Sequence, residues 1–141
     1  MDREQALRDL SAADGIAAQV RRRGTWYAGY CAGAAVASLA CTYAIGMSPA
    51  PWGSAAATAV LLAVFTALTV HGIRQPVSPR GFAALHVASM AAWGVLYAAA
   101  LAVGAYLFPG EAAWWLPAAA ATALPFLAAG AVALRTARRP M

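Results

Sequence analysis

Polar and apolar residues are segregated along this chain into four long apolar runs separated by short polar or proline-rich stretches. The runs cover residues 25–46, 54–73, 82–107 and 112–134, and none of them contains Asp, Glu, Lys or Arg. Each run is about as long as the ~20 residues that cross the hydrocarbon core of a bilayer as a helix. The pattern predicts an all-α fold, namely an integral membrane four-helix bundle.

Residues 1–24 follow a different pattern, because charged residues flank an apolar stripe with three- and four-residue spacing. The stripe consists of Leu7, Leu10, Ala13, Ala17 and Val20. This spacing predicts a short amphipathic helix, or two helical pieces if Ser11 and Asp14 form a capping box that restarts the helix. We expect the segment to lie on the cytosolic membrane surface or, alternatively, to bind a cytosolic partner.

Charge is confined to the tails and the loops. The arginines that flank the spans are Arg21, Arg22, Arg23, Arg74, Arg80, Arg135, Arg138 and Arg139. Arginines beside a span are retained in the cytosol, so we predict that residues 1–24, the central loop and the basic tail 135–141 are all cytosolic. The net charge of +5 therefore reflects topology. No nucleic-acid partner is predicted, since the N-terminal segment is too short to hold a helix-turn-helix.

Tryptophans near the two outer turns support the same borders. Trp52 begins the second run and Trp114 and Trp115 begin the fourth. Indole rings are enriched at the membrane–water interface, so these side chains are expected in an interfacial belt.

Composition agrees with a membrane protein. Of 141 residues, 62% are hydrophobic and 11% are charged, whereas soluble domains are roughly 45–50% apolar. Every basic residue is arginine and alanine is abundant, which is typical of a GC-rich bacterial genome and suggests a bacterial plasma membrane. Cys31 and Cys41 lie about 15 Å apart along one predicted helix, too far for a disulfide.

Two of the runs carry small residues at four-residue spacing. They are Gly29, Gly33 and Ala37 in the first run, and Ala55, Ala59 and Ala63 in the second. Small residues on one face let a second helix approach closely. We expect the first two spans to form a hairpin along these stripes, and the alternative is contact with a second copy of the chain.

Trp93 and Tyr97 lie near the middle of the third run. Their polar groups need partners in hydrocarbon, so both should point into the bundle, towards Ser89, Thr122 or the carbonyls that Pro125 frees. One interpretation is a small apolar ligand pocket with an aromatic wall. The other is a pair of large side chains that fills a gap between alanine-rich helices.

His71 and His86 are expected near the cytosolic border, with Cys31 and Met90 at comparable depth. Such a group suits a soft metal, and two imidazoles suit a haem. The competing interpretation is that both histidines are hydrogen-bonded packing residues, because a zinc site needs a third or fourth ligand. No cofactor is predicted, and haem or a soft metal is kept as the alternative.

The runs lack the charged residues that mark proton relays and ion paths. Small four-span multidrug exporters share the number of spans, but they depend on a carboxylate in the first span, which is absent here. No catalytic motif is present, so no enzyme is predicted.

We therefore expect an assembly, accessory or regulatory membrane component that contacts lipid and binds itself or another membrane protein. One alternative is a homodimeric transporter or efflux subunit for an uncharged lipophilic molecule. The other is a haem- or metal-binding redox subunit.

Overall fold

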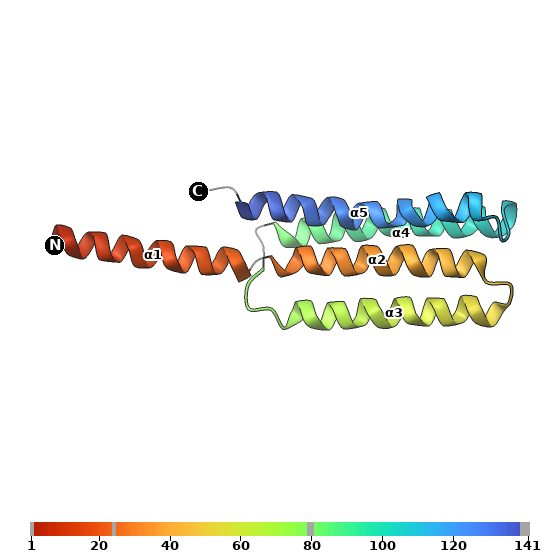
Figure 1. The fold of residues 1–141 in the computed structure, drawn as a ribbon, viewed down its shortest axis with the longest axis horizontal. Coiled ribbons are helices and arrows are strands. Elements are labelled where there is room, and N and C mark those ends of the chain that lie inside the picture. Colours follow the sequence, from red (N-terminus) through yellow and green to blue (C-terminus); the bar gives the residue numbers. More distant parts are fainter. Residues whose placement is uncertain (1, 24, 79–80, 139–141) are drawn as a thin grey trace.

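The computed structural model describes residues 2–23, 25–78 and 81–138, which form helices joined by short loops. The helices are α1 (Arg3–Arg23), α2 (Trp26–Met47), α3 (Pro51–Ile73), α4 (Phe82–Leu107) and α5 (Ala112–Arg138). Helices α2 to α5 are long and apolar enough to cross a membrane, and they run side by side (Figure 1). The predicted all-α fold with four long apolar helices is confirmed.

Helix boundaries follow from proline and glycine. Helix α3 starts three residues earlier than predicted because Pro51 occupies its first turn, where a missing amide hydrogen costs little. Gly81, directly before α4, and Gly110, two residues before the start of α5, have φ angles of 72° and 71°. Glycine adopts this left-handed backbone without a steric penalty, so both positions suit a sharp change of chain direction.

Helix α1 is one continuous helix. The Ser11 hydroxyl donates to the Arg8 carbonyl at 2.8 Å within that helix, so of the two predicted alternatives the single helix is confirmed and the restart at a capping box is wrong. Figure 1 shows α1 extending away from the bundle beyond the start of α2. Its side chains Leu7, Leu10 and Ile16 are exposed.

Helices α2 and α5 form the core, α3 packs on α2, and α4 packs mainly on α5. Small residues bring the two core helices close together: a Cβ added at Gly130 of α5 would lie 3.2 Å from the Cβ of Cys31 in α2. Larger side chains fill the remaining space between the helices. The buried cluster comprises Tyr27, Tyr30, Cys31, Ala34, Ala35, Ala123, Phe126, Ala129 and Ala133.

Helix α3 lies at the edge of the bundle, and of its residues only Leu61 is buried. Phe65 and Leu68 also pack against the core cluster. The predicted stripe of Ala55, Ala59 and Ala63 is exposed, so the expected hairpin contact along it is wrong. The opposite face of α3 contacts α2 instead, because its larger side chains make a wider contact than three methyl groups.

The small-residue stripe of α2 is only partly used. Gly33 faces α3, since a Cβ there would meet Leu68 at 3.4 Å, and Ala37 is half-buried. Gly29 is exposed and has open space where a Cβ would stand. Contact with another chain through Gly29 stays a prediction.

Trp115 anchors the end of the bundle at which α2 and α4 finish. It is 3% exposed, and a Cβ at either Gly46 of α2 or Gly104 of α4 would overlap its indole ring. Its Nε1 donates to the Phe108 carbonyl at 3.0 Å. Trp115 therefore faces other helices of the bundle, whereas Trp52 is exposed, and the interfacial depth of both rings stays a prediction.

Candidate functional site

A chain of hydrogen bonds crosses the middle of the bundle and joins three helices. Trp93 Nε1 of α4 donates to Ser38 Oγ of α2 at 2.8 Å, and Ser38 Oγ donates to Thr122 Oγ1 of α5 at 2.9 Å. The Thr122 hydroxyl donates to the Ala119 carbonyl at 2.8 Å and lies 3.5 Å from the Thr42 hydroxyl. Every polar group of this central network is thus satisfied without water, as an apolar environment requires.

Aromatic rings surround Trp93. Tyr97 stacks on it with ring centroids 5.0 Å apart, Phe65 lies at 5.0 Å and Phe126 at 6.0 Å. These rings join α3, α4 and α5 at the depth of the central network.

The structure thus brings together three of the five residues predicted for a central pocket: Trp93, Tyr97 and Thr122. Ser89 donates to the carbonyl of His86 in its own helix, and Pro125 is half-buried within α5. Because the Trp93 donor is engaged by the protein itself, these contacts match those of a packed core, and a central ligand stays a prediction. Ser38 was missed, although it is a hydroxyl in the run that faces Trp93.

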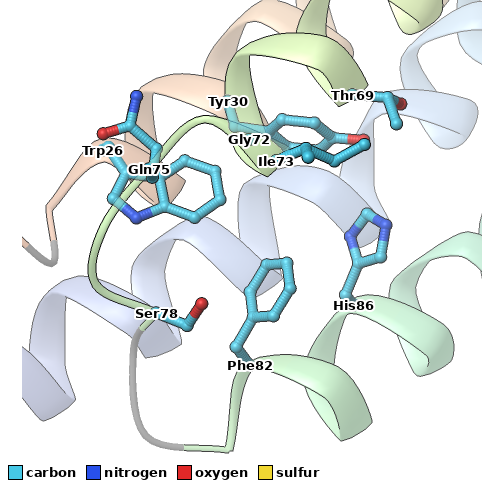
Figure 2. A pocket seen from close by; sticks show the side chains of 9 residues that line it. All are labelled: Trp26, Tyr30, Thr69, Gly72, Ile73, Gln75, Ser78, Phe82 and His86. Carbon is cyan, nitrogen blue, oxygen red and sulfur yellow. The ribbon is translucent and has the colours of Figure 1, made fainter.

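A second group of residues lies at the basic end of the bundle, which we define as the end where α2 and α4 start and α3 and α5 finish. A cavity of about 330 Å³ is found there (Figure 2). It lies between the first turns of α2 and α4, the last turns of α3 and the loop that follows α3. Its lining residues are Trp26, Tyr30, Thr69, Gly72, Ile73, Gln75, Ser78, Phe82 and His86.

Aromatic rings form the walls of this basic-end pocket. The Trp26 and Phe82 centroids are 5.6 Å apart, and His86 stacks on Phe82 at 5.3 Å and lies 5.5 Å from Tyr30 in an edge-to-face arrangement. A Cβ at Gly72 would come within 3.3 Å of the Trp26 ring. Glycine at this position therefore leaves room for the indole.

One hydrogen bond fixes the loop over the pocket. Trp26 Nε1 donates to the carbonyl of Val77 at 2.8 Å, across 51 residues of sequence. The bond holds the loop that follows α3 against the first turn of α2. The sequence does not indicate this bond, since nothing near Trp26 in the chain points to so distant a carbonyl.

The four residues considered for a metal have separate surroundings in the structure. His71 is exposed, with its Nε2 3.0 Å from Gln75 Nε2, whereas His86 Nδ1 lies 3.5 Å from the Tyr27 hydroxyl. Cys31 is buried against α5, and Met90 packs against the core cluster. Within residues 2–23, 25–78 and 81–138, no three His, Cys, Asp or Glu side chains gather into a metal site. Haem ligation by the two imidazoles stays a prediction.

The arginines predicted to set topology gather at the same end. Arg74, Arg135 and Arg138 are exposed there, at the finish of α3 and α5. The side chains of Arg21–Arg23, together with Arg80 and Arg139, fall outside the described residues. Glu111 is exposed at the opposite end of the bundle, so the two ends differ in charge.

No family model, curated protein or solved structure matches this chain. Function must therefore be inferred from the chemistry of the molecule itself. Two features stand out: a helix that contributes little to the core, and an aromatic pocket at the basic end.

Proposed function

We propose that this protein is a non-catalytic, multi-pass component of a bacterial plasma membrane, and that it assembles with another membrane protein or with itself through the outer face of α3. The unequal burial of the four apolar helices carries this proposal. Of the most apolar 18-residue stretch of each helix, 39% of residues are buried in α2 and in α5, 17% in α4 and 6% in α3.

Membrane insertion accounts for this exposure. An apolar helix with one buried residue would be insoluble in water, whereas lipid solvates its outer face. Arginines at the basic end favour a cytosolic location for that end, and Glu111 would then face the other side. Helix α1 extends from the same end into the cytosol, where its exposed Leu7, Leu10 and Ile16 are available to a soluble partner or to the membrane surface.

The outer face of α3 suits a second helix. Ala55, Ala59 and Ala63 recur at four-residue spacing on the side turned away from α2. Lipid chains are as apolar as leucine, so helix association in membranes depends on close van der Waals packing, which small side chains permit. The core formed by α2, α4 and α5 is complete without this face.

Photo-crosslinking in native membranes tests the assembly. A photoreactive amino acid at Ala59 of α3 should yield a protein adduct, whose mass separates a second copy from a different protein. The matched control is the same amino acid at Ala92, which is exposed on α4, and it should react with lipid alone. Lipid adducts alone at Ala59, or the same protein adduct at both positions, would remove the proposal.

A further inference from the structure

The basic-end pocket lies between α3 and α4, two helices that pack on different neighbours. Helix α3 packs on α2 while α4 packs mainly on α5, and the first turns of α2 contribute Trp26 and Tyr30 to the pocket lining. Ile73, on the α3 side of the pocket, is 79% exposed. This exposed side chain marks the α3 side of the pocket as open to the surroundings of the bundle.

The lining determines the class of ligand. Four rings, from Trp26, Tyr30, Phe82 and His86, favour a flat ring through stacking and edge contacts. Ser78 and Gln75 contribute a hydroxyl and an amide at the loop side (Figure 2). The described lining residues carry no carboxylate for a cation, and the arginines of this end repel one.

His86 supplies a directed polar contact. Its Nδ1 lies 3.5 Å from the Tyr27 hydroxyl, which leaves Nε2 as the ring nitrogen that serves a ligand. When Nδ1 accepts from the tyrosine, Nε2 carries the proton and donates to an oxygen. The ring that carries this nitrogen is held in place by its stack on Phe82.

We infer that the basic-end pocket binds the ring of a small, uncharged, planar amphiphile that carries carbonyl oxygens, with its apolar tail leaving between α3 and α4 into lipid. Membrane quinones belong to this chemical class. A volume of about 330 Å³ falls at the lower end of the roughly 300–1,000 Å³ range of ligand pockets, so it admits a ring headgroup and excludes a large polycyclic compound. The inference is independent of assembly through α3 and requires only that the protein is in a membrane.

Thermal unfolding of the full chain in phosphatidylcholine nanodiscs tests the inference, with decylubiquinone as the probe. A ligand that binds only the folded state raises the melting temperature, and the rise saturates with ligand concentration. Wild-type protein should show this saturable rise, whereas decanol, which has the same tail without the ring, should show none. Equal shifts with both compounds would mean partition into lipid and would overturn the inference.

Two glycine variants locate the site. Gly72→Leu should abolish the shift, because a side chain at Gly72 enters the space of the Trp26 ring and the pocket. Gly29→Leu should retain the shift. Gly29 lies about one turn after Trp26 in α2, and a Cβ at this position would have no atom within 4 Å. A shift that survives in Gly72→Leu would contradict the site.

A third variant covers the case in which Gly72→Leu does not fold. His86→Phe preserves a ring for the stack on Phe82 and removes the hydrogen-bonding nitrogen. It should weaken decylubiquinone binding about fivefold, the usual effect of one lost neutral hydrogen bond. Unchanged binding in His86→Phe would overturn the assigned orientation, and a shift produced by phosphatidylglycerol in place of the quinone would assign the pocket to a lipid headgroup.

Discussion

Helices α5 and α3 both pack on α2, yet they do so in different ways. Helix α5 approaches α2 through alanines and Gly130, shares the Ser38–Thr122 hydrogen bond with it, and has 39% of its apolar stretch buried. Helix α3 contacts α2 along one line of larger side chains, and 6% of its stretch is buried. Close approach and the interhelical Ser38–Thr122 hydrogen bond thus distinguish the core helix α5 from the edge helix α3. Apolar character does not distinguish them, because both helices are apolar.

The largest loss in the free energy of unfolding is expected for a substitution at the end of α2. Gly46→Val would force a branched side chain into the indole of Trp115, which is buried between α2 and α4. We expect a loss of about 3 kcal/mol in the free energy of unfolding, measured by SDS titration in mixed micelles. Gly29→Val, in open space on the same helix, should change it by less than about 0.5 kcal/mol. Comparable losses in the two variants would show that Trp115 does not anchor the bundle.

A smaller loss in the free energy of unfolding is expected when the hydrogen bonds of Ser38 are removed. Ser38→Ala removes both the acceptor of Trp93 and the donor to Thr122, so we expect a loss of about 1 kcal/mol, within the range of interhelical hydrogen bonds in membranes. Thr66→Ala serves as the control, because the Thr66 hydroxyl is exposed and donates to the Leu62 carbonyl of its own helix, α3. If both variants lose the same free energy of unfolding in the same titration, hydroxyl groups in the core contribute no more to stability than those in α3.

The smallest change in the free energy of unfolding is expected for a substitution on the outer face of α3. Ala59→Leu should alter the unfolding free energy of the isolated chain by less than about 0.5 kcal/mol, since Ala59 is exposed on α3. Ala119→Leu inserts the same side chain into α5 at a position that is 0% exposed, and it should cost about 1–3 kcal/mol. A large loss in Ala59→Leu alone would mean that α3 packs through its alanine face.

Run length and proline positions were sufficient to predict the helices. Predicted spans such as 82–107 and the observed α4 coincide because a long uncharged run has few alternatives to a helix. Which face of each helix packs was harder to predict. Lipid and core are equally apolar, so there is no polar face to exclude, and the stripe at Ala55, Ala59 and Ala63 was assigned to α2 on residue size alone.

The sites depended on contacts between residues far apart in sequence. Trp93 was correctly expected to find a polar partner inside the bundle, but its acceptor Ser38 lies 55 residues away and has no local signature. Trp115 matched the pattern of an interfacial residue, and only the apposition of Gly46 and Gly104 from two other helices buries it. The basic-end pocket likewise requires three helices to converge, which no single stretch of sequence indicates.

Cysteine labelling in intact cells tests the central claim, namely that hydrocarbon surrounds these helices and the basic end lies in the cytosol. Ser78 and Glu111 are exposed at opposite ends of the bundle, while Cys31 and Cys41 are buried and should give little background. A membrane-impermeant maleimide should label Glu111→Cys from outside and should reach Ser78→Cys only after permeabilisation. Labelling of Ser78→Cys in intact cells would contradict a cytosolic basic end. Recovery of the protein in the soluble fraction without detergent would contradict helices surrounded by hydrocarbon.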